Sequence, residues 1–218
     1  MGSAWVGRSV LTYTAGLVTN RPLGCLLEVV ETLVLTLIIF LVIQTFVAQP
    51  YRVEQQSMER TLEPDQYVLV DKLTPRWDDY GRGDIVVFDP PPRWVADEPR
   101  TPFIKRVIGL PGDVVEVKDG AVYVNGTRLA EPYVYDDQPT TATDEPAQWV
   151  VPAGELFVMG DHRAASADSR AFGPISRDQV IGRAWLRYWP IDMLGVLSTP
   201  TYPAPVGSGD ARPSPAAP

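Results

Sequence analysis

The sequence has 218 residues, of which 45% are apolar and 21% are charged, and its formal net charge at pH 7 is −8. This composition excludes a fully disordered chain, and the negative charge argues against a nucleic-acid-binding surface. One cysteine, Cys25, cannot form an internal disulfide, and one histidine, His162, leaves too few ligands for a zinc site. We therefore expect no metal and no other cofactor.

The first predicted element is a membrane-spanning helix. Between Glu31 and Arg52 lie 20 consecutive uncharged residues, most of them strongly apolar. At 1.5 Å per residue, this stretch matches the thickness of a bilayer core, which is about 30 Å. We predict a short N-terminal segment over residues 1–27 and a transmembrane anchor over residues 28–50.

The charges before the span indicate its orientation. Arg8 and Arg21 precede it and favour a cytoplasmic N-terminus, which places the rest of the chain outside. A cleaved secretory signal, cut after Phe46-Val47-Ala48, is the alternative. The length of the apolar segment, the acidic residues before it and the bulk of Phe46 count against cleavage.

The region after the anchor, residues 51–197, predicts a β-rich domain. It consists of short alternating runs separated by turn residues, and helical periodicity is hard to find there. The Asp119-Gly120 and Asn125-Gly126 steps between such runs are typical of tight hairpin turns. The expected fold class is therefore mainly β, with an antiparallel sheet. Residues 198–218 are rich in Pro, Ser, Ala and Gly and predict a disordered tail.

Two residues in this region are candidates for a catalytic pair. Ser57 follows the anchor closely, and a serine hydroxyl needs a base to act as a nucleophile. Lys105 lies in an alternating run that places it between Phe103 and Val107 on one strand face. Such apolar neighbours remove water from an ammonium group and lower its pKa. A lysine that reaches solvent from an edge strand is the alternative, and His162 is the other candidate base.

A third polar segment runs from Gly160 to Arg170. It contains hydroxyls, carboxylates and arginines within eleven residues. Ser166 supplies an acceptor that can orient a buried amine, and Asp168 and Arg170 can brace the loop as an ion pair. A solvated polar turn is the alternative interpretation.

Five motifs follow the anchor in order. They are Ser57-Met58-x-x-Thr61-Leu62, Asp65-x-x-Val68-Leu69-Val70, Arg82-Gly83-Asp84-Ile85-Val86-Val87-Phe88, Lys105-Arg106-Val107-Ile108-Gly109-Leu110-Pro111-Gly112-Asp113, and Gly160-Asp161-His162-Arg163 with Ser166-x-Asp168-Ser169-Arg170. Together they resemble type I signal peptidases, the membrane-anchored Ser-Lys proteases also called leader peptidases. The resemblance covers roughly residues 30–195.

The resemblance implies a role for each site residue. Ser57 is the nucleophile, and a neutral Lys105 is its general base. Ser166 hydrogen-bonds the lysine, and the Ser57 backbone N–H helps to form the oxyanion hole. The remaining implied members are Asp161, Asp168 and Arg170 as supporting residues of the active-site wall, and Gln55 as a second oxyanion donor.

The sequence departs from the family pattern at three positions. Arg60 stands where proline is usual, Gln55 where serine or glycine is common, and His162 where asparagine is common. Because proline fixes φ, the first departure puts the geometry of the nucleophile turn in doubt. We interpret His162 as structural.

The resemblance also implies an activity and a location. The expected fold is the β-sheet protease domain shared with self-cleaving SOS-response repressors. The expected activity is cleavage of signal peptides from secretory preproteins after small residues (Ala-x-Ala), at the bacterial cytoplasmic membrane. The substrate binds as an extended strand near residues 53–56 and 102–105. Membrane lipid and proximity to the secretion translocase are the other expected partners, with no nucleic acid.

Two alternatives remain open. One is a catalytically impaired homologue that acts as a membrane-anchored binding domain, which the departures at Gln55 and Arg60 motivate. The other is a Ser-His hydrolase that uses His162 as its base.

Overall fold

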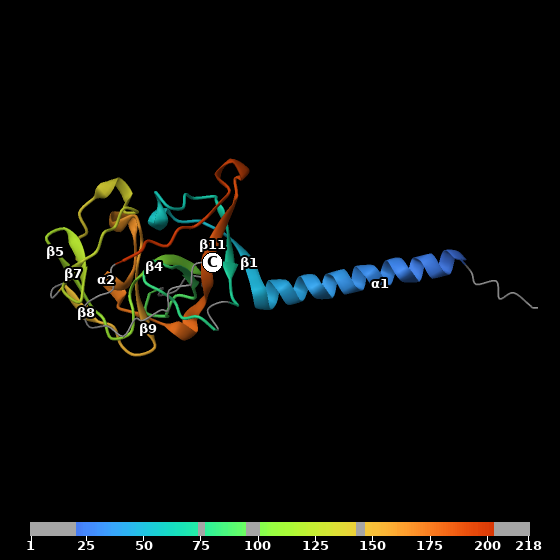
Figure 1. The fold of residues 1–218 in the computed structure, drawn as a ribbon, viewed down its shortest axis with the longest axis horizontal. Helices are drawn as coiled ribbons and strands as arrows, with labels where there is room; N and C mark the ends of the chain where they lie inside the picture. Colours follow the sequence, from blue (N-terminus) through green and yellow to red (C-terminus); the bar gives the residue numbers. More distant parts are fainter. Residues whose placement is uncertain (1–20, 74–76, 95–100, 143–146, 203–218) are drawn as a thin grey trace, which may run out of the picture. The chain divides into compact units, whose positions relative to one another are not determined.

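The computed structural model describes residues 21–73, 77–94, 101–142 and 147–202. Contacts divide the chain into two compact units, Met1–Val42 and Ile43–Pro218 (Figure 1). Arg8 and most of the predicted N-terminal segment lie outside the described residues.

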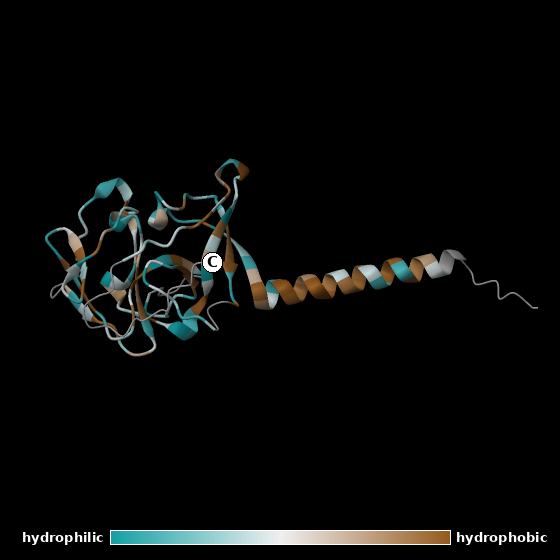
Figure 2. Ribbon diagram, viewed as in Figure 1, coloured by the Kyte–Doolittle hydropathy of each residue, from teal (hydrophilic) through white to brown (hydrophobic). Residues whose placement is uncertain are grey.

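The N-terminal unit contains one long apolar helix. Helix α1 spans Arg21–Val42, and a π-helical turn, Ile43–Val47, continues it. Together, residues Gly24–Val47 are long and apolar enough to cross a membrane (Figure 2). None of the most apolar part of this segment is buried. A long, mostly apolar helix with exposed side chains fits a single-pass membrane anchor.

The second unit is built from two antiparallel sheets. The larger one has eight strands in the order β1-β2-β11-β3-β4-β9-β10, with β12 paired to β11, and the smaller one has the order β7-β6-β5-β8. The prediction of a mainly β, antiparallel domain is therefore confirmed. The strands are β1 Ala48–Arg52, β2 Tyr67–Asp71, β3 Ile85–Phe88, β4 Phe103–Gly109, β5 Val114–Lys118, β6 Ala121–Val124, β7 Thr127–Arg128, β8 Gln148–Val150, β9 Glu155–Met159, β10 Ile175–Ser176, β11 Val180–Trp189 and β12 Gly195–Val196.

Short helical turns connect these strands. They are η2 Gln56–Met58, η4 Tyr135–Asp137, η5 Arg163–Ala165, α2 Ser169–Phe172, η6 Arg177–Gln179 and η7 Ile191–Met193. Strand β1 begins at Ala48, so the last three residues of the predicted anchor belong to the sheet instead.

The predicted hairpin turns are present in the smaller sheet. Asp119 and Gly120 have φ values of 51° and 74°, and Asn125 and Gly126 have 50° and 78°. Two consecutive left-handed residues are what a two-residue hairpin turn requires. The turns join β5 to β6 and β6 to β7.

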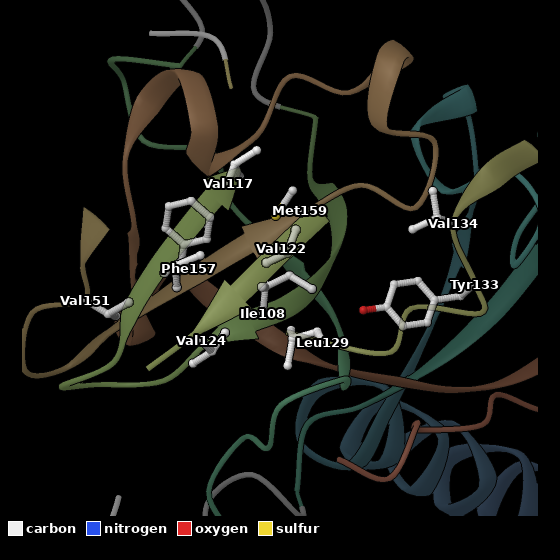
Figure 3. Close-up of a cluster of buried hydrophobic side chains, with 11 residues drawn as sticks. Ile108, Val117, Val122, Val124, Leu129, Tyr133, Val134, Val151, Phe157 and Met159 are labelled. Atoms are coloured by element: carbon white, nitrogen blue, oxygen red, sulfur yellow. The ribbon is translucent and has the colours of Figure 1, made fainter. Parts of the chain in front are cut away.

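Apolar side chains from both sheets form the core. One buried cluster joins Ile108 of β4 and Phe157 of β9 to the inner face of the smaller sheet (Figure 3). A second cluster contains Met58 and Leu62, both fully buried, from the turn that carries Ser57. Burial of these side chains, each contributing about 1.5–3 kcal/mol, fixes that turn to the sheet.

The C-terminal segment corrects one prediction. Residues 198–202, which composition placed in a disordered tail, pack against the domain. The Thr199 hydroxyl donates to Asp84 at 3.2 Å, and the hydroxyls of Tyr133 and Tyr202 lie 2.7 Å apart. Gly83, with φ of 92°, leaves room for this segment. Composition missed these contacts because their partners lie far away along the chain; residues 203–218 lie outside the described residues.

Candidate active site

Ser57 and Lys105 meet in the interior of the domain. Ser57 belongs to η2, directly after β1, and Lys105 lies in the middle of β4. The Lys105 Nζ lies 2.7 Å from the Ser57 Oγ, and 3.1 Å from the carbonyl oxygen of Ile104. The exposed fractions of Ser57 and Lys105 are 2% and 1%. A hydroxyl and an amine are therefore in hydrogen-bond contact, away from bulk water.

Burial changes the protonation of this amine. Removal of water lowers the pKa of Lys105 from 10.5 to about 8, and the negative charges of Asp168 and Asp161 oppose the shift. Its Nζ lies 5.2 Å from the centre of the Phe103 ring, and Val107 is fully buried. These are the two apolar neighbours that strand alternation predicted. A substantial fraction of the lysine is neutral at mildly alkaline pH, as a general base requires.

A glycine lets the polar segment approach the nucleophile turn. The N–H of His162 donates to the Ser57 carbonyl oxygen at 3.0 Å. A Cβ on Gly160 would overlap the Ser166 hydroxyl and lie 2.5 Å from the same carbonyl oxygen. No larger residue fits at this position unless the nucleophile turn moves.

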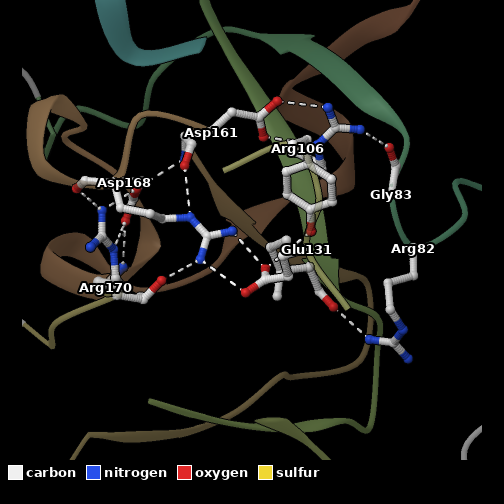
Figure 4. A network of polar contacts seen from close by, with 12 residues as sticks. Arg82, Gly83, Arg106, Glu131, Asp161, Asp168 and Arg170 are labelled. Atoms are coloured by element: carbon white, nitrogen blue, oxygen red, sulfur yellow. Dashed lines mark hydrogen bonds and ion pairs between the residues drawn. The ribbon is translucent and has the colours of Figure 1, made fainter. Parts of the chain in front are cut away.

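Asp168 organises the polar segment. It forms a two-pronged ion pair with Arg170, with Nε–Oδ1 and Nη2–Oδ2 distances of 2.9 and 2.8 Å, so the structure contains the predicted pair (Figure 4). Burial by itself raises the pKa of Asp168, but hydrogen bonds from Arg170, Ser166 and the Gly160 N–H, with the Arg170 charge, hold that pKa below its usual value. The carboxylate therefore stays ionised beside the buried lysine.

Ser166 has a different partner from the one that the resemblance implied. Its hydroxyl donates to Asp168 Oδ2 at 2.7 Å. Among the described residues, no hydrogen bond joins Ser166 to Lys105. In this structure Ser166 instead supports the acidic residue whose charge acts on the lysine.

Asp161 is the centre of a second buried network. Arg106 donates to both of its carboxylate oxygens, at 2.8 and 2.6 Å (Figure 4). The Thr61 hydroxyl also donates to it, at 2.5 Å. Arg106 also donates to the Gly83 carbonyl oxygen at 2.8 Å and lies over the Tyr133 ring. These contacts tie the nucleophile turn to the lysine strand.

Sequence reasoning missed the roles of Arg106 and Thr61, although both stand in quoted motifs. The adjacent residues Lys105 and Arg106 could have indicated this network. Neighbouring side chains on a strand point to opposite faces, so Arg106 is buried on the face opposite Lys105 and requires an acidic partner.

An apolar groove runs beside the serine. It has a volume of about 200 Å³, and its walls are the segments 50–55 and 101–104, which include much of the two segments predicted to hold substrate. Val53, Val68 and Val87 form its buried apolar lining, and Gln55 also lines it. In the described ranges, no group of three or more His, Cys, Asp or Glu side chains is placed to hold a metal ion.

Comparison with known proteins identifies the family. The family model described as "Signal peptidase, peptidase S26" matches residues 26–189, about three quarters of the chain. This chain belongs to the S26 signal peptidase family.

Two relatives, from Synechocystis and Bacillus licheniformis, agree with this assignment. A probable signal peptidase I-2 of Synechocystis is 39% identical over 179 residues, which are 82% of this chain and 80% of that protein. A signal peptidase I of Bacillus licheniformis is 34% identical over 181 residues, 80% of this chain and 94% of that protein. A crystal structure of a signal peptidase I from Enterococcus faecalis is 35% identical, covers 49% of this chain and 97% of its own, and has a TM-score of 0.40.

In this S26 signal peptidase family member, the side chain of the one histidine contacts Glu59 and Tyr135. The His162 Nδ1 lies 2.6 Å from Glu59 Oε2, and its ring stacks on Tyr135 with centres 4.3 Å apart. Among the described residues, the hydrogen bond between His162 and Ser57 is made by the His162 backbone N–H. This geometry offers a Ser-His mechanism no support.

Proposed function

We propose that this protein is a membrane-anchored serine endopeptidase that removes signal peptides from secretory preproteins with a Ser57–Lys105 dyad. The observation that carries the proposal is the 2.7 Å contact between Lys105 Nζ and Ser57 Oγ, in a buried site beside an apolar groove. Membership of the S26 signal peptidase family supports the substrate class. The catalytically impaired alternative lacks support, because both reacting groups are present and in contact.

The proposed reaction uses one proton carrier. Neutral Lys105 takes the hydroxyl proton as Ser57 attacks the scissile carbonyl carbon. The oxyanion is stabilised by the Ser57 backbone N–H and the Gln55 amide. Protonated Lys105 then gives its proton to the leaving amine, and the amine of Lys105, neutral again, activates the water that hydrolyses the acyl-enzyme.

The groove is the proposed substrate-binding site. We propose that the preprotein binds as an extended strand between the segments 50–55 and 101–104, so that alternate side chains enter the groove. Its buried lining of Val53, Val68 and Val87 suits apolar side chains such as alanine. Together with membership of the S26 signal peptidase family, this supports the specificity for Ala-x-Ala.

The anchor places the dyad near its substrate. We propose that α1 spans the bacterial cytoplasmic membrane with a cytoplasmic N-terminus and that the β domain is extracytoplasmic. Ser57 lies nine positions after Ala48 in the sequence, a reach of at most about 30 Å. A preprotein that leaves the translocase presents its cleavage site at the same lipid surface, so tethering of both partners shortens the search.

The direct test is cleavage of a preprotein by the full-length protein in detergent. We expect a single cut after the second alanine of an Ala-x-Ala site, read by mass spectrometry. Substitution of that alanine by phenylalanine is expected to reduce cleavage at least about 100-fold, because the proposed Ala-x-Ala specificity requires a small residue at this position. Folded protein that leaves both preproteins intact would support the binding-domain alternative.

The pH dependence follows from the lowered pKa of Lys105. Only the neutral amine accepts a proton, so kcat is expected to rise about tenfold per pH unit below the pKa and to level off above about 8. The measurement is kcat with a saturating peptide substrate between about pH 6 and pH 10. A kcat that rises only near the ordinary lysine value, about 10.4, contradicts a desolvated base.

A further inference from the structure

The turn that follows Ser57 contains a backbone conformation that proline cannot adopt. Arg60 has a φ of 79°, and its N–H donates to Glu63 Oε1 at 3.3 Å. Proline is restricted to φ near −65° and has no N–H. A residue with a Cβ remains in the left-handed region only when surrounding contacts hold it there. The contacts of the Arg60 side chain therefore matter for the shape of the turn.

Those contacts reach a distant segment. Arg60 Nη1 donates to the Val134 carbonyl oxygen at 2.5 Å and to Asp137 Oδ1 at 2.7 Å. Val134 and Asp137 flank and end η4, in which Asp136 and Asp137 also have left-handed φ values, 53° and 50°. One guanidinium group thus connects two turns that both carry unfavourable backbone conformations.

The second turn leads back to the nucleophile. Tyr135, in η4, stacks on the ring of His162. His162 donates its backbone N–H to the Ser57 carbonyl oxygen at 3.0 Å, and its Nδ1 lies 2.6 Å from Glu59 Oε2. These contacts therefore connect the Arg60 side chain, through η4 and His162, to Ser57.

We propose that Arg60 is a positioning residue for Ser57. Through residues 134–137 and His162 it fixes the Ser57 carbonyl group, and with it the direction of the hydroxyl toward Lys105. The inference rests on the proposed function. Arg60 is absent from the groove lining, so its loss acts on the catalytic step and leaves substrate binding unchanged.

Substitution by glycine tests this in the full-length protein. Glycine adopts φ of 79° without strain, so Arg60→Gly keeps the backbone and removes only the tether. We expect kcat to fall on the order of tenfold, because small displacements of a reacting group are costly, with KM changed less than about twofold. The thermal midpoint is expected to stay nearly constant, because the Arg60–Asp137 pair is 41% and 82% exposed. Arg60→Lys is expected to restore part of kcat.

Two further variants sharpen the test. Arg177→Ala is the matched control, since it breaks an Arg–Asp pair of similar exposure, 30% and 81%, and it is expected to keep wild-type kcat. Asp137→Asn preserves the left-handed turn and removes the charge. Its loss in kcat is expected to be non-additive with that of Arg60→Gly, because both break the same contact. An Arg60→Gly enzyme with wild-type kcat would overturn the proposal.

Hydrogen exchange separates this inference from the proposed function. Arg60→Gly is expected to speed exchange of the His162 amide, whether or not the protein cleaves preproteins. Unchanged exchange at His162 overturns the positioning role of Arg60. Wild-type protein that cleaves no preprotein overturns the proposed function instead.

Discussion

Replacement of Lys105 by methionine is expected to lower the rate of preprotein cleavage by at least about 1,000-fold. Methionine has a similar length and an apolar character, so it fills the site beside Phe103, but it accepts no proton from Ser57. Loss of a general base that activates a nucleophile typically costs factors of this size. The Ser57→Ala enzyme is expected to be equally inactive, because the two residues act as a unit.

The same substitution is expected to stabilise the fold. The pKa of Lys105 is about 8 in the folded protein, whereas an exposed lysine in an unfolded chain has its ordinary pKa of 10.5, so unfolded chains hold this proton more tightly. Below pH 8 the folded state carries the full cost of a buried ammonium, about 3 kcal/mol, and the cost disappears above pH 10.5. Methionine removes this cost. The net gain in stability is smaller, because the hydrogen bonds from Lys105 to Ser57 and Ile104 are lost.

Urea denaturation at pH 7 and at about pH 10 measures the effect. Lys105→Met is expected to raise the free energy of unfolding more at the lower pH. Lys118→Met is the matched control, because Lys118 is exposed, where it pairs with Glu116 and lies over the Tyr123 ring; cleavage and stability should both stay near wild type. The dyad would be refuted if the Lys105→Met enzyme still cleaved preproteins and the His162→Ala enzyme did not.

The second large effect is expected from Asp161→Asn, which should destabilise the domain by about 3–5 kcal/mol. The substitution leaves the guanidinium of Arg106, only 1% exposed, without a counter-charge. It also weakens the acceptor for Thr61, which follows the nucleophile. We expect the protein to unfold at lower urea concentration and to lose cleavage activity, because the Thr61 and Arg106 contacts position the dyad.

Asp65→Asn is the matched control for this substitution. Asp65 pairs with Arg52 at the surface, where the side chains are 75% and 54% exposed, and solvent screens such a pair. Asparagine also tolerates the left-handed backbone at this position, φ of 69°. Little change is expected. Equal denaturation midpoints for the two variants would show that the buried Arg106–Asp161 pair contributes no more to stability than the exposed Arg52–Asp65 pair.

Buried ion pairs recur around the dyad. Beside Arg106–Asp161, the pairs Arg170–Asp168 and Arg163–Glu131 are almost fully removed from solvent. Desolvation offsets most of the attraction within such pairs, so they contribute little net stability compared with apolar residues of similar size. Their directional hydrogen bonds hold the polar segment around Gly160 in one arrangement, against which Ser57 and Lys105 are aligned.

The amino-acid sequence by itself determined the local elements, and its motifs, through the family resemblance, gave Ser57 and Lys105 as the proposed catalytic pair. Three local signals were sufficient. The apolar run near the N-terminus indicates a membrane span, the Asp-Gly and Asn-Gly steps indicate hairpin turns, and the period of two indicates strands with one buried face. The alternation of Phe103, Lys105 and Val107 was enough to predict a desolvated amine. These signals are local, so they are readable without any knowledge of the fold.

The tertiary structure alone decided which side chains meet. Arg106 and Asp161 are 55 residues apart, and they pair because β4 lies beside β9 in the sheet. The left-handed backbone of Arg60 and the docking of Tyr202 on Tyr133 have no local signature. Each depends on strand order and on the space left by neighbouring segments, because a polar group in the interior bonds to whatever partner the packing brings within reach.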